Sequence, residues 1–230
     1  MLENANYIYL DGTFSVVTGL YFQLYTVHAI YWNHILTVVY ILLPGKKQHL
    51  YKEMFHQIKN LIPNFGPPNF PTSILSGCFF HLCQNIYLVV VRFGLKTLYD
   101  DNGDFAKQIR SLPALALLPI LDVIPTFVER KAQFQAESEH VLTYFEEYYI
   151  GGIQSHLSHP RKAAKYDILL WNEQNYIDAE IIQANAGVTK LRRKDQVRQE
   201  TCILNILNEP TKTALEKVMA LAQIISLKKS

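Results

Sequence analysis

Two apolar runs separated by a short turn constrain the fold of this chain more than any other feature. Residues 20–30 and 35–43 are rich in Tyr, Val, Ile and Thr, the residue types that favour strands. Trp32, Asn33 and His34 lie between the runs, with Asn33 as the turn former, and this order predicts a β-hairpin. Because both runs are apolar almost throughout, we expect a sheet that is covered on both faces.

The residues on either side of the hairpin extend this pattern. A short apolar strand at residues 7–10 ends at Asp11, and Gly12 follows it as a breaker. After the hairpin, apolar residues recur at helical spacing within residues 46–61, which predicts a helix over one face of the sheet. These apolar residues are Leu50, Met54, Phe55, Ile58 and Leu61.

The rest of the chain is predicted to be mainly helical. Residues 72–80 form an extended run, and we expect them to make one strand that pairs beside the Asp11 strand. Helical patterns follow at residues 81–98, 104–110, 114–118, 123–130 and 137–149, with breaks at the prolines, and a helical tail is predicted at residues 179–185, 195–208 and 211–227. The expected domains are a core at residues 1–150, a linker and core remnant at 151–176, and a basic helical tail at 177–230.

Composition excludes several classes of protein. With 230 residues, 49% hydrophobic and 18% charged, the chain has enough apolar material for a core, so wholesale disorder is not expected. A net charge of +2 does not by itself indicate a nucleic-acid binder, and three cysteines favour a reducing compartment. Prolines interrupt the longest apolar stretch, at residues 112–128, so we expect no membrane span, and the first residues predict no signal peptide.

Several sequence strings form an unusual set. The first is Asp11-Gly12-Thr13-Phe14, at the end of an apolar strand, and another is the run at residues 76–84, which contains Cys78 and His81 in a Cys-x-x-His arrangement. Four further strings belong to the set, at residues 22–28, 39–44, 112–116 and 144–151. Together these strings resemble the catalytic domain of Mutator-like element (MULE) transposases.

The resemblance implies a fold and a chemistry. Members of this family have an α/β, RNase H-like core with a mixed sheet, and they cut and join DNA with three carboxylates that hold Mg²⁺ or Mn²⁺. Asp11 corresponds to the first of these carboxylates and is the implied metal ligand. Cys78 and His81 correspond to a pair that lies near the family's active site, which implies a supporting role. The resemblance also implies DNA as the partner and the nucleus as the location.

The chain departs from the family where the other two carboxylates are expected. No acidic residue lies between Glu53 and Asp100, and the stretch at residues 169–173 resembles only the approach to the last catalytic glutamate. These departures indicate two internal deletions, through decay of an element copy or an incorrect gene model. Because two-metal catalysis needs several carboxylates around two cations, we expect a vestigial Asp11, an incomplete sheet and no functionally bound Mg²⁺ or Mn²⁺.

Other interpretations of the same residues stay open. Asp11 before Gly12 also fits a turn, and Cys78 with His81 also fits a buried thiol and a satisfied histidine. A structural zinc site needs four ligands, and the further ligands would have to come from Cys83 or from the distant His156 and His159, so zinc is not expected. The carboxylates after the Cys-x-x-His pair are expected to be solvated charges, and Glu173 and Asp178 are expected to approach a site only if the shortened core refolds. The solvated set is Asp100, Asp101, Asp104 and Glu129.

A basic run in the tail is the clearest nucleic-acid feature. It contains Lys190, Arg192, Arg193 and Lys194, and such a cluster fits contacts to DNA phosphates, a solvated helix face or a nuclear-localisation signal. The sequence therefore predicts a catalytically degenerate MULE transposase-like protein with sequence-independent DNA binding and a tendency to self-associate. The alternatives are a non-enzymatic interaction protein derived from the element, and an active metal-dependent transposase or nuclease if the two gaps are artefacts.

Overall fold

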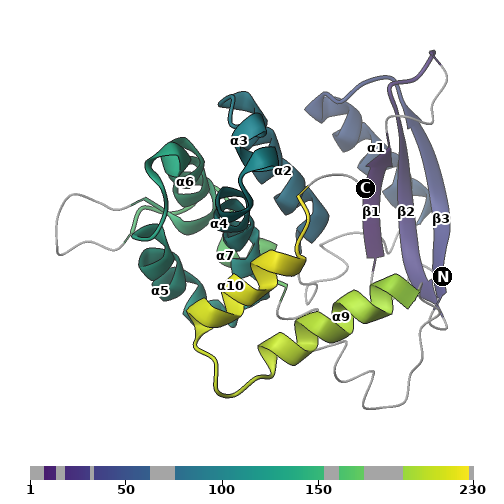
Figure 1. Cartoon of the computed structure of the whole chain (residues 1–230). Coiled ribbons are helices and arrows are strands. Elements are labelled where there is room, and N and C mark those ends of the chain that lie inside the picture. Colours follow the sequence, from purple (N-terminus) through teal and green to yellow (C-terminus); the bar gives the residue numbers. More distant parts are fainter. Residues whose placement is uncertain are drawn as a thin grey trace. The chain divides into compact units, whose positions relative to one another are not determined.

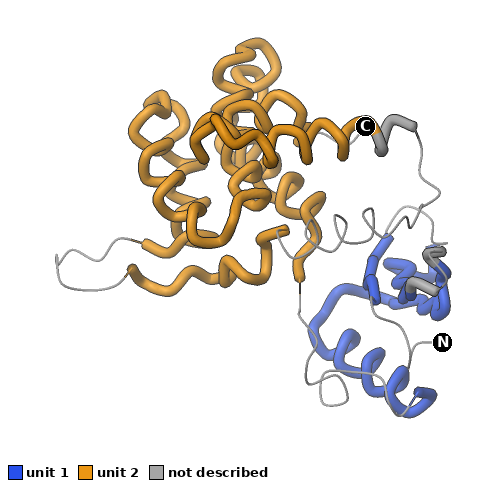
Figure 2. Tube along the Cα trace, turned by 90° about the horizontal axis from the view of Figure 1, so that it is seen from below, with its two compact units in different colours: residues 1–74, 187–191 blue, residues 75–186, 192–230 orange. Residues whose placement is uncertain are grey.

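A computed structural model of the chain describes residues 8–13, 19–31, 34–62, 76–152, 161–173 and 194–227. The chain divides into two compact units (Figure 2). Unit 1 contains Met1–Ile74 and Gly187–Leu191, and unit 2 contains Leu75–Ala186 and Arg192–Ser230. The described strands all belong to unit 1, and the described part of unit 2 is helical. The molecule is therefore mixed α/β, as the sequence predicts, while an RNase H-like arrangement and domain boundaries at 150 and 176 stay predictions.

Unit 1 contains an antiparallel sheet of three strands in the order β1-β2-β3 (Figure 1). The strands are β1 (Ile8–Thr13), β2 (Gln23–Tyr31) and β3 (His34–Leu43). The predicted hairpin is confirmed as β2 and β3. The pairing skips Val38, because Val27 pairs with Val39 and His28 pairs with Thr37. The mixed sheet that the family resemblance implies is not present in the described residues, since all of their strand pairs are antiparallel.

One helix, α1 (Gln48–Leu61), covers one face of this sheet and confirms the prediction from apolar spacing. Val27 and Ala29 of β2 are buried together with Met54 and Ile58 of α1. Side chains alternate between the two faces of a strand, so the neighbours of these residues lie on the opposite face. Tyr40 and Leu42 of β3 are 67% and 48% exposed on that face. Within the described part of unit 1, the sheet is therefore covered on one face and not on both.

Unit 2 is built from helices around one apolar cluster. Its first helix, α2, places Leu82, Ile86, Val89 and Val90 in that cluster at helical spacing. The longer helices are α2 (Phe79–Arg92), α4 (Gly103–Ala114), α5 (Ile120–Lys131), α9 (Lys194–Leu207) and α10 (Ala214–Ile224). The shorter turns are α3 (Lys96–Asp101), η2 (Leu115–Leu117), η3 (Ala136–Ser138), α6 (Glu139–Phe145), η4 (Glu146–Ile150) and α7 (Ile168–Trp171). None of the described helices has both the length and the hydropathy needed to cross a bilayer.

Two expected elements differ from the structure. The strand predicted at residues 72–80 is wrong at its end, because Phe79 and Phe80 begin α2; residues 72–75 lie outside the described residues. The burial of every third or fourth side chain in α2 favours a helix over the strand preference of the aromatic pair. The single helix predicted at residues 81–98 is two helices, since Gly94 has a φ of 71° and separates α2 from α3.

The predicted tail and linker both pack into unit 2. Helix α10 packs against α4, and Val218 and Leu221 are fully buried in the common cluster. A capping box fixes its start, because the Thr213 hydroxyl accepts from the Glu216 N–H and the Glu216 carboxylate accepts from the Thr213 N–H. Residues 161–166 differ from the expected linker, since Arg161 pairs with the buried Glu146 and Tyr166 packs against the same cluster. Trp171, in the expected core remnant, is buried in that cluster.

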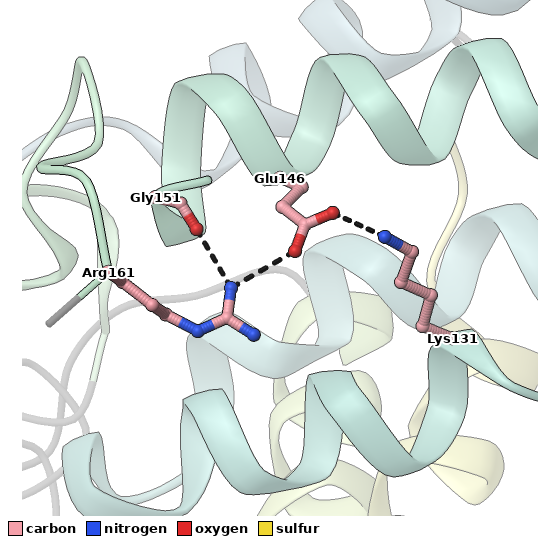
Figure 3. A network of polar contacts seen from close by, with 4 residues as sticks. All are labelled: Lys131, Glu146, Gly151 and Arg161. Carbon is pink, nitrogen blue, oxygen red and sulfur yellow. Dashed lines mark hydrogen bonds and ion pairs between the residues drawn. The ribbon is translucent and has the colours of Figure 1, made fainter. Parts of the chain in front are cut away.

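A buried carboxylate joins three segments of unit 2 (Figure 3). Glu146 opens the π-helical turn η4 and is 8% exposed. Lys131 at the end of α5 donates to Glu146 Oε2, and Arg161 donates to Glu146 Oε1 at 3.1 Å and to the Gly151 carbonyl oxygen at 2.8 Å. Because both carboxylate oxygens have a cationic partner, this ion-pair group fixes α5, η4 and the chain at Arg161 to one another.

Candidate functional site

Asp11 lies in the middle of β1, opposite Thr26 of β2, and is exposed. Its carboxylate accepts a long hydrogen bond of 3.4 Å from the Thr13 hydroxyl. By strand alternation, Asp11 and Thr13 point to the face of the sheet that α1 does not cover. The prediction that the strand ends at Asp11 with Gly12 as a breaker is wrong, because Asp11, Gly12 and Thr13 all pair with β2. Asp11 lies within the strand, on the open face.

A row of polar side chains crosses the same face. His28 of β2 lies between two threonines, with its Nε2 2.8 Å from the Thr26 hydroxyl and its Nδ1 2.9 Å from the Thr37 hydroxyl. Both ring nitrogens are therefore engaged by hydroxyl groups. Hydroxyls and an engaged imidazole are poor magnesium ligands compared with carboxylates. Asp11 and its neighbours among the described residues do not fit the two-metal centre that the family resemblance implies.

The Cys-x-x-His block occupies the start of α2 in unit 2. Cys78 is the N-cap residue and is exposed, and its side chain makes no capping hydrogen bond. His81 is exposed one turn further on and contacts the Phe80 ring edge-on at 5.6 Å between ring centres. A helix start leaves several backbone N–H groups without partners inside the helix. With a cysteine at the N-cap, these groups need an acceptor from elsewhere in the chain.

A segment distant in sequence supplies that acceptor. The Gly77 N–H donates to the Leu170 carbonyl oxygen at 2.5 Å, which holds the residues before α2 against α7. At the end of the same segment, the Glu173 side chain accepts a hydrogen bond from the Phe79 backbone N–H. The carboxylate therefore lies at the N-terminus of α2, where the helix dipole favours negative charge.

Buried polar contacts fix the position of Glu173. The Trp171 indole N–H donates to the Tyr149 carbonyl oxygen at 3.2 Å, and the Asn172 side-chain amide donates to the Leu118 carbonyl oxygen at 2.8 Å. The Glu173 N–H itself donates to the Ala116 carbonyl oxygen at 2.8 Å. Trp171 and Asn172 are 4% and 3% exposed. The backbone on the N-terminal side of Glu173 is thus anchored within the core of unit 2.

The surroundings change the proton affinity of two side chains at this site. Burial raises the pKa of Glu173 to about 7, although the hydrogen bond from the Phe79 N–H favours the charged form. Burial also raises the pKa of Cys83 to about 12, and the neighbouring Cys78 and Glu173 add to this rise. The Cys83 thiol therefore stays protonated and is a poor nucleophile. Glu173 can hold or release a proton near neutral pH, as a general acid or base requires.

Metal ligands do not gather at either place. The described ranges contain no group of three or more His, Cys, Asp or Glu side chains that could hold a metal ion. Cys78, Cys83 and Glu173 lie near one another, yet a buried thiol with a raised pKa does not readily provide the thiolate that zinc binds. His156 and His159 lie outside the described residues. The expectation that the protein holds no functionally bound Mg²⁺ or Mn²⁺ and no zinc stays a prediction.

The basic run lies mostly outside the described part of the chain. Lys190, Arg192 and Arg193 are not described, and Lys194 is the first residue of α9. The C-terminal half of this helix has an apolar face, where Ile203, Leu204 and Leu207 pack against the core of unit 2. Contact of the basic run with DNA therefore stays a prediction.

Comparisons with known proteins identify no relative of this chain. No family model, no curated protein and no solved structure matches the chain. The resemblance to MULE transposases thus depends on the sequence strings alone.

Glu173 is the residue of the candidate site that sequence reasoning placed least well. Local patterns gave it no site, since its partners at the start of α2 and after α4 are far away in sequence. One signal was available in the sequence: Cys78, Phe79 and Phe80, the residues before the helix predicted at residues 81–98, include no capping Ser, Thr, Asp or Asn. A helix start without its own cap predicts an acceptor from another segment.

Proposed function

We propose that this chain derives from a MULE-type transposase, has lost DNA cleavage and joining, and retains sequence-independent DNA binding. One observation carries the proposal. The Cys-x-x-His block and the stretch that ends at Glu173 both resemble regions near the family's active site. Two hydrogen bonds join them, one from the Gly77 N–H to the Leu170 carbonyl oxygen and one from the Phe79 N–H to the Glu173 carboxylate. Two sequence strings that were identified separately are thus neighbours in space.

The architecture of unit 1 gives further support. An antiparallel hairpin follows a strand that carries Asp11, and a helix then covers the sheet, which is compatible with the first part of an RNase H-like core. The proposed loss of catalysis is argued from the surroundings of two carboxylates, Asp11 and Glu173. Among the described residues, the Asp11 carboxylate has a hydroxyl contact from Thr13 and no second carboxylate with it in a metal-holding group. Glu173 holds its proton up to about pH 7, so neither residue provides the charge density that two divalent cations need.

A cleavage assay tests the catalytic part of the proposal. The purified full chain is incubated with supercoiled plasmid and with short duplexes, in Mg²⁺ and separately in Mn²⁺, beside the variants Asp11→Ala and Glu173→Gln. We expect no nicking, cleavage or joining above the level of these variants. Metal-dependent cleavage that Asp11→Ala abolishes would restore Asp11 as a catalytic ligand. Cleavage that only Glu173→Gln abolishes would identify Glu173 as a replacement carboxylate.

A binding assay tests the DNA part. Fluorescence anisotropy with unrelated duplexes, over a range of salt concentrations, is expected to give equal affinities that fall steeply as salt rises, because each neutralised phosphate releases counterions. Replacing Arg192, Arg193 and Lys194 by Ala should flatten the salt slope by about one unit per lost contact. The matched control replaces three exposed lysines elsewhere, Lys47, Lys52 and Lys212, by Ala. Equal effects of the two triple variants would assign the basic run to a solvated surface.

The same assays separate this proposal from its main alternative. If the chain neither cleaves DNA nor binds it with a steep salt dependence, the results favour the alternative, a non-enzymatic interaction protein derived from the element. The exposed apolar residues on the open sheet face, Tyr40 and Leu42 among them, are the observation that favours this second candidate.

A further inference from the structure

Strand β3 is an outer strand of the sheet in unit 1. In the order β1-β2-β3, one edge of β3 pairs with β2. No described strand pairs with its other edge. Such an edge presents backbone N–H and carbonyl groups that can pair with another strand.

The sequence of β3 carries neither the charges nor the prolines that commonly protect an edge. Its ten residues, His34–Leu43, include no Lys, Arg, Asp, Glu, Pro or Gly. Natural proteins commonly place charges or prolines on edge strands, which prevents pairing with another chain. The other edge of the sheet differs, because β1 has six residues and carries the exposed carboxylate of Asp11 at its centre. Of the two outer strands, β3 is therefore the one suited to pairing.

The exposed side chains of β3 are apolar as well. Tyr40, Leu42 and Leu36 are 67%, 48% and 37% exposed. The skipped Val38 interrupts the pairing pattern with β2 and leaves residues 39–43 as an uninterrupted stretch. A stretch of this kind offers main-chain hydrogen bonds along its edge and apolar side chains on its faces.

We propose that the edge of β3 with which no described strand pairs is joined antiparallel to β3 of a second copy of this chain, which forms a two-fold dimer. A strand without charges is compatible with its own copy, because pairing it with itself brings no like charges together. A charged partner strand would find no opposite charge on β3. Pairing of identical edges also closes after two copies, whereas β1 on β3 would extend without limit. The inference does not depend on the proposed function.

Two measurements on the full chain test the dimer. Sedimentation over a range of protein concentrations should show a monomer–dimer equilibrium. Hydrogen exchange should show that β3 amides exchange more slowly as the dimer forms, while α1 amides keep their rates, because only strand pairing adds backbone hydrogen bonds. Packing of two sheet faces against each other would form dimers without this change in β3.

A matched pair of variants identifies the surface. Leu42→Lys places a cation on the outer strand β3, and we expect it to raise the dimer dissociation constant about tenfold or more. Leu61→Lys makes the same change at the end of α1, where Leu61 is 79% exposed, and should leave the constant unchanged.

Four results would overturn the proposal. The first is a chain that stays monomeric at about 1 mM. The second is growth beyond two copies. The third is an equal effect of the two lysine variants. The fourth is β3 amides that are protected to the same degree at every concentration, which would show that a segment of the same chain already covers the edge.

Discussion

Replacing Glu173 by Gln should make the protein more stable at neutral and alkaline pH. In the folded chain, burial raises the pKa of this carboxyl from 4.5 to about 7, so ionising it in place costs free energy. Gln has nearly the same shape, carries no charge, and its side-chain oxygen can still accept from the Phe79 N–H. The substitution therefore removes the cost of ionisation and keeps the hydrogen bond at the start of α2.

The direction of the pH dependence follows from where each state loses its proton. Below about pH 4.5 the carboxyl is protonated in the folded and the unfolded chain, and Glu173 adds no pH dependence. Between pH 4.5 and about 7 the folded chain binds more protons than the unfolded chain, so its free energy of unfolding falls as pH rises. Above about pH 7 both states are ionised and the loss is complete. The Gln variant lacks this loss at every pH.

The magnitude follows from the rise in pKa. One pKa unit corresponds to about 1.4 kcal/mol, so the rise from 4.5 to about 7 sets an upper limit of about 3 kcal/mol. Because Glu173 is only half-buried, solvent screens part of this cost, and we expect a gain of about 1–2 kcal/mol for Glu173→Gln at pH 8. At pH 4.5 and below, the variant and the unchanged chain should be equally stable.

Urea denaturation at a series of pH values measures this difference. Glu129→Gln is the matched control, since Glu129 is exposed on α5, and it should show no comparable gain. A Gln variant that is less stable than the unchanged chain at pH 8 would refute the reasoning. That result would mean that the ionised carboxylate stabilises α2 by capping it more than burial destabilises it.

Two further predictions concern unit 2 and use the same denaturation assay. Gly151→Ala should lose more than about 2 kcal/mol, because Gly151 has a φ of 92° and a Cβ there would lie 2.2 Å from the Lys162 carbonyl oxygen. Gly94→Ala is its control and should lose only about 1 kcal/mol, because Gly94 has a φ of 71° with nothing within 4 Å of a new Cβ. Glu146→Gln should lose about 2–4 kcal/mol, because it leaves two partly buried cations without their shared carboxylate. If Glu146→Gln costs no more than Glu129→Gln, the ion-pair group does not hold its three segments together.

Local patterns in the sequence predicted the elements of unit 1 well. The Val, Ile, Thr and Tyr content of residues 20–43 and the turn at Asn33 were enough for the hairpin, because strand preference and turn formation act between near neighbours. The spacing of Met54 and Ile58 was enough for α1, since both are buried on the face that meets the sheet. The first strand was predicted too short, because β1 continues through Gly12 to Thr13. The described part of unit 1 also covers one sheet face and not two, because apolar content does not say what lies against a strand.

The same reasoning failed where distant segments decide the structure. Phe79 and Phe80 favour a strand by their residue type, yet the burial of the following residues in the core of unit 2 makes them the first turn of α2. Residues 161–166 are polar and resemble a linker, yet Tyr166 packs in an aromatic group with Tyr148 and Tyr149. Neither contact leaves a periodic signal in the sequence, because each joins segments that are far apart along the chain.

The pKa of Glu173 also depends on contacts between distant segments. A carboxyl at the start of a helix is usually ionised and stabilises the helix, whereas a carboxyl buried among apolar residues is usually protonated. Glu173 is subject to both effects, and burial is the larger, so its pKa lies near 7 and not near 4.5. A group in this state is unsuited to holding two divalent cations but suited to exchanging one proton at neutral pH.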